Sequence, residues 1–385
     1  MAGYSDSEIP SLFFGPNESK RVDVTLSLKH EAAQPVPTGK PQFFDQPEFT
    51  VAGVTDTTSL GGHGSDAIVR TRESLAKETV ALGKDPAGAA PLGTYERERD
   101  KLQASLAQED RAELHHALGD VQEKLGNSLE AVREYQRAAE INPSETYLFD
   151  WGSELLLHHA PEPAAEVFRK GNQLFPRSVR MLIGLGAAWF ARGSYDQAVQ
   201  KICEASDLNP GDSAAYLFLG MMQSAEPAPA AEALEKLHRF VTLQPQNAQA
   251  NYYYAVGLWK VRKGPEDSAS TAHVEALLRN AIHLDPKYAA AYLQLGIVHS
   301  DEKDYAQAIS DYRQAIQSDP EMQIEEAHYR LAQAYRRVGD VANAEAELRI
   351  YDKVAKESAQ KTERERHEVR QFVYTLRDQP AAQAP

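Results

Sequence analysis

The stretch that decides the fold is AAAYLQLGIVHSDEKDYAQAISDYRQAIQSDP, residues 289–320. Its first half carries residues at i, i+3, i+4 and i+7, which is the spacing of one helix face: Tyr292, Leu295, Gly296 and His299. Lys303-Asp304 interrupts this pattern, and a second helical face follows from Tyr305 to Ile316. Pro320 ends it, because proline cannot continue a helix. The stretch therefore predicts two helices joined by a short turn.

The same pattern returns along the chain with a nearly constant period. Each copy ends near a proline, usually after an apolar and a polar residue: Pro143, Pro176, Pro210, Pro245, Pro286 and Pro320. Successive prolines are 33, 34, 35, 41 and 34 residues apart. A period near 34 fits two helices of three to four turns with two short turns. With a seventh copy at 325–355, which has no closing proline, the array is predicted to span 109–355.

These residues resemble the tetratricopeptide repeat (TPR), a unit of two helices with large and small residues at fixed positions. Residues 289–320 match the family pattern at seven places: Tyr292, Leu295, Gly296, Ala308, Tyr312, Ala315 and Pro320. His299 departs from it, because the family has an aromatic residue there. The likeness keeps its phase in the first, third and seventh copies. It implies an all-α fold, a right-handed solenoid of helix-turn-helix repeats.

The segments outside the repeats are predicted from local patterns. Residues 1–64 are expected to be mostly extended or irregular, with short strands where apolar residues alternate with polar ones, as in 22–28. Residues 65–108 are expected to form linker helices, the first from about Ala67 to Leu82. Residues 356–378 are expected to form a long C-terminal capping helix, with dimerisation as its alternative role. A disordered tail is expected at 379–385.

Composition excludes several functions. The net charge of −15 disfavours non-specific binding to nucleic acid. A single cysteine, Cys203, cannot form an internal disulfide or a four-cysteine metal site. No run of 18 apolar residues occurs, so no membrane span is expected. The first residues do not form a secretory signal, so we expect a cytoplasmic protein, or an exported or periplasmic one if an upstream leader is missing.

The sequence contains no convincing catalytic or metal-binding constellation. The pairs His115-His116 and His158-His159 are direct neighbours, and neighbours on a helix point in different directions. The glycine-rich turn 61–65 lacks the lysine of a phosphate-binding loop. We therefore predict that the chain is not an enzyme and that it uses no cofactor and no metal.

The resemblance implies that the first helix of each unit lines a concave groove. The positions carried over from the family give these candidate groove residues: Phe149, Leu156, Ile183, Phe190, Leu217, Met221, Tyr252, Val256, Trp259, Leu293, Ile297, Arg336 and Arg337. The middle of the groove is apolar and aromatic, unlike the family's carboxylate clamps. Arg336 and Arg337, with Lys260, Arg262 and Lys263, suggest a local anion site, for which solvated charge is the alternative.

The groove predicts a non-catalytic scaffold or adaptor that binds a peptide or protein segment. The partner's identity stays open, and the chain's own N-terminal segment, residues 40–60, is a second candidate occupant because it is rich in aromatic side chains. Two further functions stay open. One is an accessory subunit of an enzyme or of a secretion or envelope assembly complex. The other is a structural homo-oligomer formed through the C-terminal helix.

Overall fold

The computed structural model describes most of the chain from Gly64 onward. Its described ranges are 64–83, 91–226, 230–264, 268–319 and 325–357, together with Gln360. Contacts divide the chain into two compact units, 1–47 and 48–385, and every described residue belongs to the second. The predicted N-terminal strands, the candidate occupant 40–60 and the tail 379–385 lie outside the described residues.

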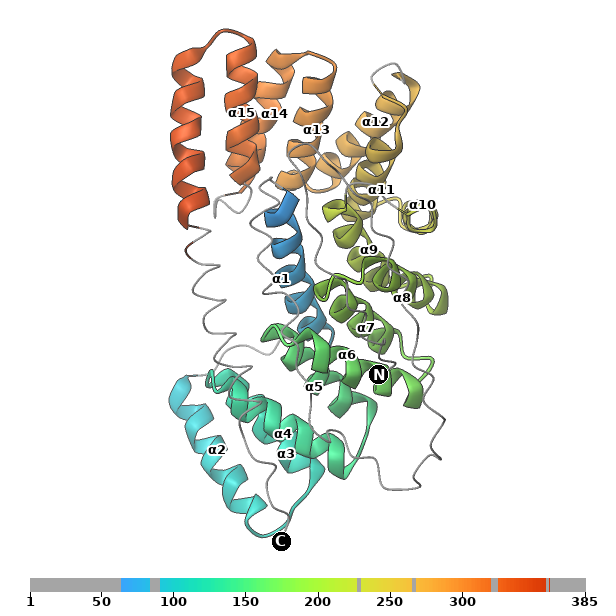
Figure 1. Cartoon of the computed structure of the whole chain (residues 1–385), viewed down its shortest axis with the longest axis vertical. Coiled ribbons are helices and arrows are strands. Elements are labelled where there is room, and N and C mark those ends of the chain that lie inside the picture. The colour runs from blue at the N-terminus through green and yellow to red at the C-terminus, as the bar shows by residue number, and fades with distance from the viewer. Residues whose placement is uncertain are drawn as a thin grey trace, which may run out of the picture. The chain divides into compact units, whose positions relative to one another are not determined.

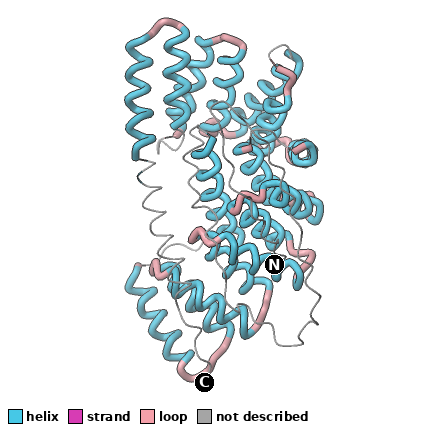
Figure 2. The backbone as a smooth tube through the Cα atoms, in the orientation of Figure 1, coloured by secondary structure: helices cyan, strands magenta, loops and turns pink. Residues whose placement is uncertain are grey.

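The described part of the chain consists of helices and short turns, without a strand (Figure 2). Its helices are α1 (Gly64–Gly83), α2 (Leu92–Leu106), α3 (Ala112–Lys124), α4 (Ser128–Ile141), α5 (Glu145–Leu157), α6 (Pro161–Leu174), α7 (Val179–Ala191), α8 (Tyr195–Leu208), α9 (Ser213–Ala225), α10 (Ala231–Leu243), α11 (Ala248–Val261), α12 (Ser268–Leu284), α13 (Ala289–Asp301), α14 (Tyr305–Ser318) and α15 (Glu325–Arg337). A further helical stretch covers 341–357.

From α3 onward the helices form seven consecutive pairs. Units 1 to 6 are α3–α4, α5–α6, α7–α8, α9–α10, α11–α12 and α13–α14, and unit 7 pairs α15 with 341–357. Through units 1 to 6 the second helix of each pair also packs on the first helix of the next (Figure 1). Contacts of this kind, mainly between neighbours along the chain, define a solenoid. The predicted all-α, TPR-type fold is therefore confirmed.

Side-chain caps begin several of the first helices, one or two residues after the proline that marks a repeat. Ser144 accepts the backbone N–H of Tyr147 at the start of α5, and Ser178 accepts that of Met181 at the start of α7. Asn247 does the same for α11. A capped helix start satisfies one of the free N–H groups at that end. The proline and the cap together fix where one unit stops and the next begins.

Pairs of a small and a large residue hold the two helices of a unit close together. A Cβ atom built on Gly119 would lie 2.7 Å from the Tyr135 ring, and one on Gly296 would lie 2.5 Å from the Tyr312 ring. Gly152 and Phe168 form the same pair in unit 2. Each glycine therefore leaves the space that its aromatic partner fills, which explains why these residue types recur at these two repeat positions.

The turn between the two helices needs a left-handed residue. Glycine takes this conformation in units 1, 3 and 7, at Gly126, Gly193 and Gly339, with φ of 77°, 85° and 82°. Units 2 and 6 place His159 and Lys303 there instead, with φ of 56° and 66°. Only glycine adopts this region without a steric penalty, so units 2 and 6 carry some backbone strain at this turn.

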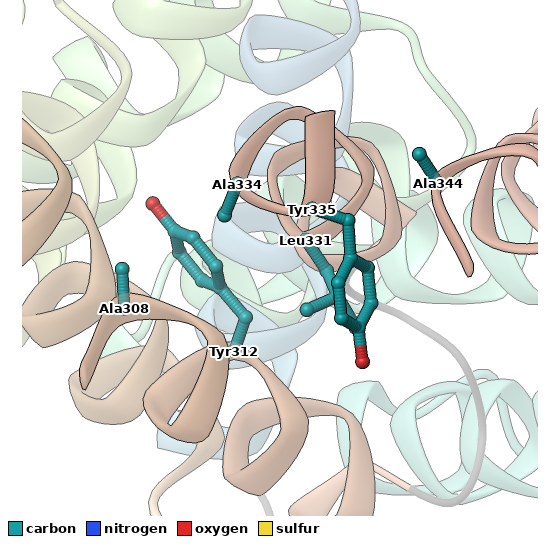
Figure 3. Packing of buried hydrophobic residues seen from close by; sticks show 6 residues of the cluster. All are labelled: Ala308, Tyr312, Leu331, Ala334, Tyr335 and Ala344. Atoms are coloured by element: carbon teal, nitrogen blue, oxygen red, sulfur yellow. The ribbon is translucent and has the colours of Figure 1, made fainter. Parts of the chain in front are cut away.

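The last units share a core that crosses from one unit to the next. Figure 3 shows Tyr312 of α14 and Leu331, Ala334 and Tyr335 of α15 gathered in one cluster, with Ala308 and Ala344 at its sides. Leu293 and Ile297 of α13 pack against this cluster. Side chains expected in the groove therefore also contribute to the packing between units 6 and 7.

Candidate binding groove

The candidate groove residues lie on the first helices of successive units, namely α5, α7, α9, α11, α13 and α15. We call the surface that these helices form the inner face. Helix α1 packs along three of them, α5, α7 and α9 (Figure 1). The sequence predicts α1 as a linker helix, but it has these long-range contacts with the array as well. The inner face of units 2 to 4 is therefore already in contact with a helix from the same chain.

One stripe of α1 is buried and the opposite stripe is exposed. Leu75, Ala76 and Thr79 are only 1%, 4% and 0% exposed. Lys77 and Ala81 lie on the other side and are exposed. Residues three or four positions apart share one face of a helix, so α1 contacts its surroundings as an amphipathic helix does.

Contacts at both ends show how α1 crosses the array. Near its start, the Arg70 guanidinium donates to the Glu325 carboxylate of α15 at 2.6 Å, and Arg72 donates to the Tyr195 hydroxyl at 3.2 Å. At its end, a Cβ atom on Gly83 would lie 2.6 Å from the Asp150 carboxylate of α5. Helix α1 therefore reaches from unit 7 to unit 2, and its last residue must be very small.

Burial separates the candidate groove residues into three groups. The first group is buried and contains the candidates on α5 and α7, together with one on α11: Phe149, Leu156, Ile183, Phe190 and Val256. The middle group is partly buried: Leu217, Met221, Tyr252, Trp259, Leu293 and Ile297. Arg336 and Arg337 are exposed. The inner face of units 2 and 3 is therefore not an open surface, whereas units 5 and 6 keep part of theirs accessible.

Aromatic rings are concentrated at unit 5. The Tyr252 ring lies 5.2 Å from the ring of Tyr253 and 5.0 Å from that of Tyr288, measured between centroids. Burial and the negative charge of Glu78 on α1 raise the pKa of Tyr253 to about 12. The Arg262 guanidinium lies 3.2 Å from the Trp259 ring centroid. This part of the inner face combines aromatic surface with one fixed cation.

Two of the basic residues that suggested an anion site have internal partners. Lys260 donates to the backbone carbonyls of Gln223 and Ser224 at 2.8 Å each, at the end of α9. Burial lowers the pKa of Lys260 to about 8, although the Glu226 carboxylate acts in the opposite direction. Arg262 donates to the Asp301 carboxylate at 2.9 Å. An anion site built on Lys260 and Arg262 is therefore not favoured, because both cations already hold the array together.

Several histidines are paired with carboxylates between helices. His299 lies 2.5 Å from Asp311 and 2.9 Å from Glu275, and His328 lies 2.7 Å from Glu347. Within the described ranges, no group of three or more His, Cys, Asp or Glu side chains could hold a metal ion. No described helix is long and apolar enough to cross a membrane. These histidine–carboxylate pairs connect neighbouring helices of the array.

The sequence analysis missed the position of α1, although the spacing of its small residues carried a signal. Leu75, Ala76, Thr79 and Gly83 follow one another at helical spacing and form a stripe of mostly small residues. Such a stripe indicates close contact with another helix. It does not say which helix, because the partners in α5, α7 and α9 lie far away along the chain.

The repeats of this chain match models of one known family. Models of the tetratricopeptide repeat match residues 112–145, 161–213 and 289–322. Human tetratricopeptide repeat protein 6 is 25% identical over 229 residues, which cover 57% of this chain but only 41% of that protein. Among solved structures, yeast Tom70 is 14% identical, with 82% of this chain and 76% of Tom70 covered and a TM-score of 0.49. MamA is 25% identical, with 47% and 97% covered and a TM-score of 0.35.

The matched segments coincide with the helix pairs of the structure. Residues 112–145 contain α3 and α4, and 289–322 contain α13 and α14. The glycine and aromatic pairs described above lie inside these segments. The repeat is therefore present both as a sequence pattern and as a packed unit, and the chain contains tetratricopeptide repeats.

Proposed function

We propose that this chain is a non-catalytic interaction scaffold that binds a segment of a partner protein on the inner face of its repeats. TPR proteins are generally interaction scaffolds and are typically not catalytic. One observation carries the proposal for this chain in particular. Its inner face already accommodates a helix, α1, through a stripe that is almost fully buried. A surface that packs on one helix in this way is suited to protein segments.

The accessible part of the inner face has the residue types that anchor partners. Tyr252 and Trp259 on α11 and Ile297 on α13 are only partly buried. Large aromatic and aliphatic side chains of this kind dominate the binding energy of many protein interfaces. The exposed Arg336 and Arg337 on α15 extend the same face with positive charge. The accessible part of the proposed binding surface therefore runs from unit 5 to unit 7, next to the part that α1 covers.

Site-specific photocrosslinking in the native host tests this proposal. A photoreactive phenylalanine analogue is placed at Trp259 or Ile297 on the inner face. The matched controls carry it at Leu174 or Leu243, which are exposed at the ends of α6 and α10. We expect one discrete protein partner to be crosslinked from both inner positions and from neither control. Crosslinks from the controls alone, or from no position, would overturn the proposal.

A second copy of the chain is a distinct outcome of the same experiment. Crosslinks from Trp259 and Ile297 to another copy would favour the structural homo-oligomer over the scaffold. Mass spectrometry of the crosslinked peptides separates the two, because it identifies the captured protein directly.

A further inference from the structure

Helix α1 contacts the repeats much as a separate ligand would. Its buried stripe consists of Leu75, Ala76 and Thr79, and the partly buried Gly83 continues it against α5. The Thr79 hydroxyl donates to the Leu75 backbone carbonyl of the same helix, at 2.6 Å. The hydroxyl therefore needs no partner on the inner face, and the stripe presents a mostly apolar surface with small side chains. Any helix with this stripe could make the same contacts.

The basic side chains near the start of α1 add direction to this contact. Arg70 reaches Glu325, whose side chain is only 9% exposed, and Arg72 reaches Tyr195. Both arginines precede Leu75 by three to five residues. Arg70 lies against unit 7 and Arg72 against unit 3, while Gly83 at the other end of α1 lies against unit 2. A chain with a net charge of −15 also attracts basic segments over a distance. The inner face therefore distinguishes the two ends of a helix.

We infer that α1 is a built-in occupant of the inner face, and that the partner binds through an amphipathic helix that replaces it. The partner helix carries arginine or lysine one turn before a leucine, followed by small residues at the positions of Ala76, Thr79 and Gly83. This inference rests on the proposed function and specifies the class of partner. The shape favours a helix over an extended peptide, since units 2 to 4 are already packed around one.

Because α1 belongs to the same chain, a partner helix can bind in its place only when α1 has been released. A segment tethered to its own binding surface competes at a high effective concentration, which can be on the order of 1 mM. The apparent Kd of the partner rises by the inverse of the fraction of molecules in which α1 is released. Most of the stability of an amphipathic helix comes from the packing of its apolar face, so α1 is expected to lose helical order when it leaves the inner face. Loosening α1 should therefore tighten the binding of a helix added in trans.

Two substitutions on α1 in the full chain provide a matched test. Ala76→Arg places a large cation in the buried stripe, whereas Ala81→Arg makes the same change on the exposed side. The probe is a fluorescent synthetic peptide with the sequence of residues 64–83, and its binding is followed by anisotropy. We expect the Ala76→Arg chain to bind the probe at least about tenfold more tightly than the Ala81→Arg chain. A probe that itself carries Ala76→Arg should bind neither.

Release of α1 is checked independently in the same chain. Cys203 is the only cysteine and is buried, so a cysteine introduced by Thr79→Cys reports the exposure of the stripe through its rate of labelling. Combined with Ala76→Arg it should react faster than with Ala81→Arg. If Ala76→Arg lowers the helical content measured by circular dichroism, Thr79→Arg replaces it in the binding test.

Three results would overturn the inference. The first is equal, weak binding of the probe to both variants although labelling shows that α1 is released. The second is equally tight binding to both variants, because α1 would then not compete. The third is a wild-type dimer, measured by light scattering, that Ala76→Arg converts to a monomer, because α1 would then be exchanged between copies. None of these results affects the photocrosslinks from Trp259, so the proposed function is judged separately.

Discussion

Units 2 and 3 and units 5 and 6 share one repeat architecture but use their inner faces differently. In units 2 and 3, α1 packs along α5 and α7, and the candidate groove residues on those helices are buried. In units 5 and 6 most of the equivalent residues are partly exposed, and the buried pair His299–Asp311 connects α13 to α14. The comparison teaches that repeat position decides where a side chain points, and that its neighbours decide whether it stays accessible.

The largest expected difference in stability is between two substitutions at the same repeat position, one in each region. Ile183 in unit 3 and Leu293 in unit 6 are the fifth residues of their repeats, but Ile183 is buried and Leu293 is partly exposed. Ile183→Ala should lower the free energy of unfolding by about 2–5 kcal/mol, the range for fully buried aliphatic side chains. Leu293→Ala should lower it by less than about half as much, because less apolar surface is lost. Urea unfolding followed by circular dichroism measures both.

This comparison has a clear point of failure. If the two substitutions lowered the free energy of unfolding equally, or if Leu293→Ala lowered it more, the difference in burial would not decide the effect on stability. Lys77→Ala, on the exposed side of α1, serves as a control and should change stability by less than about 0.5 kcal/mol.

The second prediction concerns pH in units 5 and 6. Burial by itself would lower the pKa of His299, but hydrogen bonds to Glu275 and Asp311 outweigh it and raise the pKa above its ordinary value. The protonated imidazole is therefore favoured by folding. The resulting stabilisation is complete below the ordinary pKa of about 6.5 and is lost as the pH rises through the raised pKa. The counterparts in unit 2 are Asp150 paired with His116 of unit 1 at 2.7 Å, and Glu154 paired with His158 at 3.1 Å.

The measurement compares wild type with His299→Gln across pH 5.5–9. At the low end the substitution should destabilise the chain by about 1.5–3 kcal/mol, the range for a hydrogen bond to a charged group. The difference should shrink as the pH rises. His273→Gln, at an exposed histidine of α12, provides the control for the same substitution at the surface. A difference that stays constant or grows with pH would contradict the assigned charge.

The repeats could be read from the sequence because their decisive contacts are local. Gly296 and Tyr312 are 16 residues apart and recur at the same spacing as Gly119 and Tyr135, so one unit predicts the others. The position of α1 could not be read in this way. Gly83 packs against Asp150, which is 67 residues away in the sequence, and Arg70 pairs with Glu325, which is 255 residues away. Neither pair follows the spacing of the repeat. The accessible part of the groove depends on α1, so it could not be predicted either.

The smallest expected effect on stability is at the turn between the two helices of a unit, where the two regions should behave alike. His159 in unit 2 and Lys303 in unit 6 both hold the left-handed turn position that glycine fills in units 1, 3 and 7. Replacing either with glycine removes the clash of Cβ with the backbone and should stabilise the chain by about 1 kcal/mol, slightly offset by the greater freedom of glycine in the unfolded chain. Gly339→Ala in unit 7 is the converse change and should destabilise by about as much. Thermal unfolding of the three variants measures these effects.

Similar gains from His159→Gly and Lys303→Gly would show that the two regions share their backbone and differ only where α1 and the ion pairs act. A gain in one unit alone would mean that the difference between the regions extends to the turns as well.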